Sequence, residues 1–243
     1  MERHERFLRA LDASRAESGF ESAELSLFEP FVAREIAEKL IWRAGKNLWD
    51  TAAHRVATLC SLYEYLRADT VIIDLRGDDE ERELHDVLEC GGFLPRGARF
   101  TLISDETAVL KRAEKSDSVG AAASFTVGGD SFGKPMIRLS RAESVSEREK
   151  DIASAAESGC AGVYLAKIGV NELEAARTNH IALLGGVGVD TINLDRPIDV
   201  HERVATLAEG GVLLPGSGGF GEETSYLGCI SMLGAYNRRR ISP

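Results

Sequence analysis

Short, nearly continuous apolar runs recur along this chain at intervals of roughly 20 to 30 residues, and they limit its fold more than any other feature. Runs of this kind, without regular alternation of polar and apolar residues, are typical of parallel strands that are buried on both faces. The sequence predicts eight strands, at residues 24–28, 70–75, 99–104, 119–124, 135–139, 162–166, 181–184 and 211–214.

Amphipathic segments with helical periodicity lie between these runs, and they predict helices at residues 31–42, 51–67, 146–158 and 197–209. Alternation of strands with helices indicates an α/β protein with a parallel sheet. Eight strands favour a single (β/α)8 barrel of the TIM type, in a shortened or irregular form. An open doubly wound sheet is the alternative, although no GxGxxG motif follows an early strand.

The length of 243 residues suits one such barrel, and a hydrophobic content of 44% supplies a sizeable core. We therefore expect one barrel domain over residues 1–243. In this division, residues 1–68 form an N-terminal helical segment plus the first strand, and residues 69–243 form the remaining barrel.

The net charge of −10 argues against nucleic-acid binding, which needs a basic face. No apolar run approaches the ~20 residues that span a bilayer, and the N-terminus has no apolar secretory core. The cysteines Cys60, Cys90, Cys160 and Cys229 lie far apart, and no HxH or HExxH pattern occurs. The sequence therefore predicts a cytoplasmic protein with no metal and no cofactor. The oligomeric state stays open, with a homodimer as one alternative.

Two of the later runs end in glycine-rich turns. The run at 181–184 leads into Gly185 and Gly186, and the run at 211–214 leads into a turn with Ser217 and Gly218. Glycines let backbone N–H groups approach an anionic ligand without a Cβ in the way, and barrel enzymes build such sites at their last strands. The turns predict a ligand site; two ordinary strand-to-helix turns are the alternative.

Asp74 is the best candidate for a catalytic residue. It lies near the C-terminal end of the run at 70–75, and Arg76, two residues on, points to the same side. A half-shielded carboxylate there could hold an N–H donor or move a proton. The alternative is a structural pair between Asp74 and Arg76.

Other basic residues are candidates for substrate binding. Arg43 and Lys46 lie three residues apart beside a glycine, which suits a carboxylate or phosphate clamp, or else a helix C-terminus with a glycine cap. Lys167 directly follows the predicted strand at 162–166. A lysine at that place can form a Schiff base only when desolvation lowers its pKa.

Several longer motifs carry a family resemblance. They read SGCAGVYL at 158–165, ALLGGVGVD at 182–190 and EGGVLLPGSGG at 209–219. With these motifs, residues 134–239 resemble the uroporphyrinogen decarboxylase superfamily. That group comprises tetrapyrrole decarboxylases, corrinoid-dependent methyltransferases and cobalamin-independent methionine synthase, all on TIM-barrel scaffolds. Two N-terminal segments, WRAGKNL at 42–48 and ADTVIID at 68–74, resemble the decarboxylase segments that carry carboxylate-binding arginines and an essential aspartate.

The resemblance implies that Arg43 and Lys46 bind substrate carboxylates and that Asp74 is the acid that binds a pyrrole. The chain differs from the family at two of these positions. Lys46 stands where the decarboxylases have an arginine, and lysine cannot fork onto a carboxylate as arginine does. Ser217 stands where the decarboxylases have a histidine and the methyltransferases a zinc-binding cysteine.

The function implied by the resemblance is cofactor-free decarboxylation, by a lyase, of a tetrapyrrole-type polycarboxylate, which is a small anionic substrate. Three alternatives remain: a methyltransferase of the same superfamily with a corrinoid protein as partner, a phosphate-binding barrel isomerase or aldolase, and a degenerate barrel that binds a ligand without turnover. The predicted catalytic residue is Asp74. The predicted substrate-binding residues are Arg43, Lys46, Arg76, Lys167, Gly185, Gly186, Ser217 and Gly218.

Overall fold

A computed structural model of the chain describes residues 2–15, 25–41, 49–126, 133–194 and 196–241, with the side chains of 194 and 237–241 left out. These residues form one parallel sheet of seven strands in the order in which they occur in the chain. The strands are β1 (Thr70–Asp74), β2 (Arg99–Ile103), β3 (Val119–Ser124), β4 (Met136–Leu139), β5 (Gly162–Leu165), β6 (Ala182–Gly186) and β7 (Leu214–Gly216).

The strand order never reverses, because each strand pairs in parallel with the next one in sequence. A doubly wound sheet reverses its order at a switch point, so that alternative is wrong. The order is that of a barrel-like sheet that winds in one direction. Backbone pairing between β1 and β7 is not seen among the described residues.

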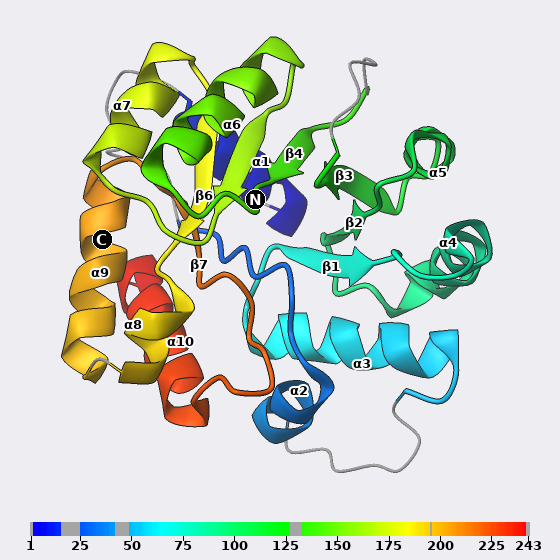
Figure 1. Cartoon of the computed structure of the whole chain (residues 1–243). Coiled ribbons are helices and arrows are strands. Elements are labelled where there is room, and N and C mark those ends of the chain that lie inside the picture. Colours follow the sequence, from blue (N-terminus) through cyan, green and yellow to red (C-terminus); the bar gives the residue numbers. More distant parts are fainter. Residues whose placement is uncertain (1, 16–24, 42–48, 127–132, 195, 242–243) are drawn as a thin grey trace.

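Helices surround the sheet (Figure 1). In that view α2 and α3 lie below the strands, α4 and α5 to the right, α6 and α7 above, and α8, α9 and α10 to the left. Their bounds are α1 (Arg3–Ala13), α2 (Arg34–Leu40), α3 (Ala52–Tyr65), α4 (Glu80–Glu89), α5 (Thr107–Ala113), α6 (Val145–Glu157), α7 (Val170–Thr178), α8 (Val189–Leu194), α9 (Pro197–Glu209) and α10 (Tyr226–Ile241), with a 3-10 turn at Cys90–Phe93. The four predicted helices correspond to α2, α3, α6 and α9 and are confirmed, although α2 is shorter than predicted.

The predicted strand at 24–28 is wrong as a regular strand. The described part of it belongs to an extended segment, residues 25–33, that runs beside β7. Ser26 N donates to Leu213 O at 2.9 Å, and Phe28 N donates to Pro215 O at 3.0 Å. On the other side, the Tyr63 hydroxyl of α3 donates to the Glu29 carbonyl at 2.7 Å. On the α3 side, a hydrogen bond from the Tyr63 side chain therefore replaces backbone pairing. The segment is extended, but among the described residues its backbone is bonded to a neighbouring strand only on the β7 side.

The last strand begins later than the sequence predicts, at Leu214 instead of residue 211. The amides of Gly211 and Val212 are bonded to the carbonyls of Ala208 and Leu207, at the end of α9. These two residues therefore finish the helix, and their amides are not free for the sheet. The other six predicted strands are confirmed within two residues at either end.

Helix α1 covers the amino ends of the strands. Arg6 Nη2 lies 2.7 Å from Asp69 Oδ1, directly before β1, and Arg6 is largely buried. Phe7 and Leu11, on the same helix, are buried in the core. Because α1 closes this end, the carboxyl ends of the strands are the open face. Among the described helices, none is long and apolar enough to cross a membrane.

Candidate functional site

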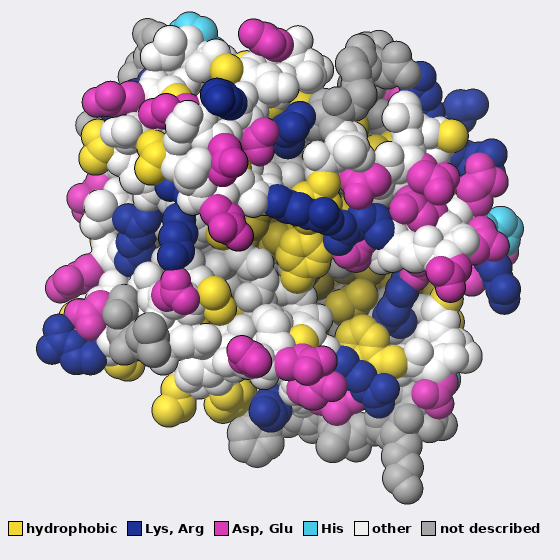
Figure 2. All heavy atoms as spheres, in the orientation of Figure 1, with side chains coloured by type: hydrophobic (Ala, Val, Ile, Leu, Met, Phe, Trp, Pro, Cys, Tyr) yellow, Lys and Arg dark blue, Asp and Glu magenta, His cyan; other side chains and the backbone are white. Residues whose placement is uncertain are grey.

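A cleft of about 350 Å³ opens at the carboxyl end of β1, between the 25–33 segment, α3 and the turn after β7. Its volume falls in the range of small-molecule sites, roughly 300–1,000 Å³. Figure 2 shows hydrophobic side chains in a hollow in the middle of this face, crossed by basic side chains and bordered by acidic ones. The cleft is lined by Pro30, Phe31, Val32, Ala33, Trp49, Arg55, Leu59, Tyr63, Ile72, Asp74, Phe220 and Gly221.

Asp74 lies at the edge of this cleft and is paired with Arg76. Arg76 Nε donates to Asp74 Oδ1 at 2.9 Å and Nη2 donates to Oδ2 at 2.6 Å, while the Arg76 amide donates to Oδ1 at 3.1 Å. The hydrogen bond to Asp74 raises the pKa of Arg76 above its ordinary value. The predicted proximity of the two side chains is confirmed. The two side chains are hydrogen-bonded as in a structural ion pair, and Asp74 also lines the cleft.

Two aromatic rings and a second guanidinium gather around Arg76. The Arg76 guanidinium carbon lies 4.4 Å from the Phe125 ring centroid and 5.6 Å from that of Phe31. The Arg141 guanidinium carbon lies 4.1 Å from the Phe125 centroid. We call Arg76, Arg141, Phe31 and Phe125 the mouth cluster. Positive charge held against aromatic faces suits a flat ligand that carries carboxylates.

Asp105, after β2, holds the mouth cluster in place. Its Oδ1 accepts hydrogen bonds from the Ser124 hydroxyl at 2.9 Å and from the Phe125 amide at 2.8 Å. Burial would raise the pKa of Asp105, but the hydrogen bonds outweigh that effect and lower it below its ordinary value. Asp105 is therefore ionised at neutral pH, and its charge lies 4.0 Å from Arg76 Nη1.

Ser217 and Gly218 lie in a turn whose amides are bonded to the protein itself. The Ser217 amide and hydroxyl both donate to Glu29 Oε2 at 2.9 Å, and the Gly218 amide donates to the Tyr164 hydroxyl at 2.7 Å. Ser217 is fully buried. The turn thus presents N–H groups as an anion-binding turn does, and the Ser217 amide is taken up by the carboxyl group of Glu29.

Glu29 is the most unusual ionisable group of the described residues. The Glu29 side chain is fully buried, and its Oε1 lies 3.5 Å from the Tyr164 hydroxyl oxygen. Burial raises the pKa of Glu29 to about 7, against the opposing effect of hydrogen bonds from Ser217, Gly219 and Tyr164. The carboxyl group can therefore exchange a proton near neutral pH. It follows an apolar run as Asp74 does, so the same sequence signal could have found it.

Gly185 and Gly186 have positive φ angles of 92° and 86° and are closely packed. A Cβ on Gly185 would lie 2.3 Å from the Leu165 carbonyl oxygen, and one on Gly186 would lie 2.7 Å from the Ile168 side chain. In this structure their lack of a side chain lets β6 approach β5 and the loop after it. The space beside them is filled by the protein.

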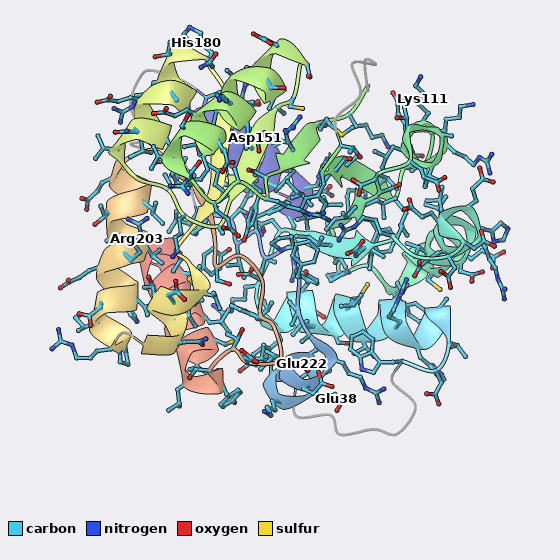
Figure 3. The ribbon with its side chains drawn as sticks, viewed as in Figure 1. Glu38, Lys111, Asp151, His180, Arg203 and Glu222 are labelled. Carbon is cyan, nitrogen blue, oxygen red and sulfur yellow. The ribbon has the colours of Figure 1, made fainter. Side chains whose placement is uncertain are left out.

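Lys167 forms an ion pair with Asp190 of α8, with 2.7 Å between Nζ and Oδ2, and both side chains are nearly two-thirds exposed. It lies after the carboxyl end of β5 but is not among the residues that line the cleft. Nearby, Arg203 of α9, labelled in Figure 3, donates to the Gly186 carbonyl at 2.8 Å and fixes the loop after β6. Arg43 and Lys46 lie outside the described residues.

Sequence reasoning missed Glu29, Trp49, Arg55, Phe125 and Arg141. Phe125 and Arg141 each follow the end of a predicted strand, which is a signal that could have found them. Trp49 and Arg55 come from the start of α3 and its approach, where no motif marks them.

Within the described ranges, no three His, Cys, Asp or Glu side chains lie close enough together to hold a metal ion. No protein-family model matches this sequence, and no curated protein matches it. The chemistry of the cleft is therefore the basis for assigning a function.

Proposed function

We propose that the chain is a cofactor-free lyase of the uroporphyrinogen decarboxylase type, which removes a carboxyl group from a tetrapyrrole-type polycarboxylate. In this proposal the seven strands and the 25–33 segment together make an irregular (β/α)8 barrel, and the cleft is its mouth. The observation that carries the proposal is the position of Asp74, on an apolar and aromatic cleft beside the guanidinium group of Arg76. The Arg141 guanidinium lies against the Phe125 ring that Arg76 also contacts.

Asp74 has the capacity to bind one pyrrole N–H. An ionised carboxylate offers about four acceptor sites. Arg76 uses three of them through its amide, Nε and Nη2. One site therefore remains for a donor from the cleft, and the pair with Arg76 keeps the carboxylate oriented toward it.

The reaction places a positive charge where Asp74 can stabilise it. Protonation makes the pyrrole ring a cation, the ring takes up the electron pair of the bond to the departing carboxylate, and carbon dioxide leaves. A proton from solvent then adds to the carbon that carried the carboxylate, and the ring gives back the proton that it had taken up, so that one proton is consumed for each carbon dioxide released. A fixed carboxylate beside the ring lowers the free energy of the cation without any reorganisation during the step. The mouth cluster would hold the remaining substrate carboxylates.

The test is Asp74→Asn, which keeps the volume and one acceptor but removes the charge. We expect binding of uroporphyrinogen to weaken by roughly ten- to more than a hundredfold, which corresponds to about 1.5–3 kcal/mol for a charge-assisted contact. The melting temperature should change little, because the pair with Arg76 is partly exposed, with Asp74 at 32% and Arg76 at 23%. Substrate binding is measured by calorimetry in the absence of oxygen, together with release of carbon dioxide and thermal melting.

A matched control is Glu81→Gln, which removes one charge from an exposed ion pair with Arg112, away from the cleft. It should leave binding and turnover unchanged. If Asp74→Asn melts much lower but binds as the native chain does, Asp74 is only a structural partner of Arg76, and the proposal is wrong.

A barrel that binds a tetrapyrrole without turnover is the second candidate. The observation that favours it is Ser217, which is buried against Glu29 and offers no side chain to the cleft. Tight binding of uroporphyrin with no release of carbon dioxide from uroporphyrinogen would support this candidate instead of the lyase.

A further inference from the structure

Two buried N–H donors on the wall of the cleft have no acceptor among the described residues. They are Nε1 of the Trp49 indole and Nε of the Arg55 guanidinium. Buried donors in folded proteins are nearly always hydrogen-bonded, and leaving one unpaired costs about 1–3 kcal/mol. Both side chains line the cleft. The two donors therefore indicate an acceptor supplied by a ligand.

Arg55 is held in position from its other side. Its Nη2 contacts Glu83 Oε1 of α4, and both side chains are mostly buried. Burial raises the pKa of Glu83 above its ordinary value, and the nearby charge of Arg55 opposes that effect. The guanidinium is thus oriented before any ligand arrives, with its Nε edge still unpaired.

The acceptor should come from the cleft. Trp49 and Arg55 also border a second hollow of about 260 Å³. That hollow is lined by Asp50, Asp79, Glu83 and Asp86 as well, so an anion there would meet several carboxylates. On the cleft side most neighbours are apolar or aromatic, such as Leu59 and Tyr63, and the acidic residue among the lining residues, Asp74, is paired with Arg76.

The size of the cleft limits what can enter. At the roughly 30 Å³ that a water molecule occupies in the liquid, a volume of about 350 Å³ equals that of about a dozen waters. That space fits a single ring with one or two acid groups. A ligand of several linked rings would extend beyond that volume through the open side of the cleft.

We propose that Trp49 and Arg55 form a subsite for a carboxylate group carried by one aromatic ring. The ring enters the cleft, and its carboxylate accepts hydrogen bonds from the Trp49 indole N–H and from Arg55 Nε. This inference rests on the proposed function in so far as the cleft is the substrate site. A large substrate then presents one ring to the cleft while its other rings lie outside.

The chain itself supplies the readout. It contains two tryptophans, Trp42 and Trp49, so Trp42→Phe leaves Trp49 as the only source of indole fluorescence. Pyrrole-2-carboxylate is titrated into this variant, with its methyl ester as the uncharged comparison. We expect saturable quenching of Trp49 by the acid and at least tenfold weaker binding of the ester.

Arg55→Gln in the same background should weaken binding of the acid at least tenfold and leave binding of the ester unchanged. Arg82→Gln is the matched control, because Arg82 lines the second hollow and is not among the cleft residues. It should bind the acid as the background does.

If Arg55→Gln lowers the melting temperature, Trp49→Phe replaces it as the test. That change keeps an aromatic ring on the wall and removes the indole N–H together with the five-membered ring that carries it, and binding is then followed from the ligand by NMR saturation transfer. Equal affinity for acid and ester, or unchanged affinity in both variants, would overturn the subsite. Acid binding that depends on Arg55, with no turnover of uroporphyrinogen, would overturn the decarboxylase and leave the subsite standing.

Discussion

At the scale of single residues, burial and hydrogen bonding have opposite effects on the pKa of Glu29. Two donors from Ser217 and one from Gly219 stabilise its charged form, yet burial has the larger effect and the pKa rises to about 7. An acid with this pKa is more easily protonated in the folded chain than in the unfolded chain. Folding is therefore linked to proton uptake at this one side chain.

The pH dependence follows from the direction of that shift. Below pH 4.5, the ordinary value for glutamate, Glu29 is protonated in both states and carries no penalty. As the pH rises toward 7, the unfolded chain loses the proton first, so the free energy of unfolding falls. The loss should reach about 3 kcal/mol above pH 7 and then level off, since one pKa unit is worth 1.36 kcal/mol.

Urea unfolding of the native chain and of Glu29→Gln from pH 5 to pH 8 measures this effect. The difference between the two curves isolates Glu29, because the groups around it do not titrate in this range. Burial raises the pKa of Tyr63 and Tyr164 well above that of an ordinary tyrosine, and raises that of Cys229 to about 12. Parallel curves for the two proteins would contradict the prediction.

The sequence could predict single residues of the site only where local spacing decides the geometry. Asp74 and Arg76 lie two residues apart after an apolar run, and they do meet. Lys167 also follows a strand, but Asp190 of a later helix pairs with it, and nothing in the sequence indicates that pairing. Trp49 and Arg55 depend on how α3 packs beside β1, which is a tertiary property.

At the scale of elements, agreement between sequence and structure was best where several local signals coincide. Helix α9 has a proline at its first residue and glycine directly after its last, and both ends match the prediction. The 25–33 segment lacks such signals. It is extended, but its pairing is set by β7 on one side and by the Tyr63 side chain on the other. Sequence periodicity predicts regular strands and helices, and it does not indicate a segment whose two sides have different partners.

The contact between the 25–33 segment and β7 predicts a strong effect of Gly216→Ala. A Cβ on Gly216 would lie 2.1 Å from the Phe28 carbonyl oxygen and 2.9 Å from the Tyr164 hydroxyl. Because the first of these atoms is backbone, the segment itself must move. We expect a loss of stability of about 1–3 kcal/mol, toward the upper end, measured by urea unfolding.

The control for this change is Gly92→Ala, since a Cβ on Gly92 meets no atom within 4 Å. It should leave the stability within about 0.5 kcal/mol of the native value. An equal effect of the two substitutions would mean that the segment does not pack on β7 in solution.

At the scale of the whole molecule, two N-terminal segments pack against the sheet. Helix α1 covers its amino ends, and the 25–33 segment lies along its last strand. In Figure 1 this segment, in blue, passes between β7 and β1. The chain thus packs two segments that precede residue 34 against strands that come later in the sequence. This arrangement places Phe31 on the wall of the cleft and buries the Glu29 side chain against Ser217.

If the 25–33 segment completes the barrel as an eighth strand would, its bonded amides should exchange slowly with solvent. Ser26 N and Phe28 N donate to alternate carbonyls of residues 213 and 215, the spacing of a parallel ladder. We expect their exchange to be within about tenfold of that of amides in β6, a difference of about 1.4 kcal/mol in opening free energy. Hydrogen exchange followed by NMR measures it, and Gly216→Ala should speed exchange at both positions. Amides of Ser26 and Phe28 that exchange many times faster than those of β6 would mean that the segment covers the sheet loosely and that the sheet is open beside β7.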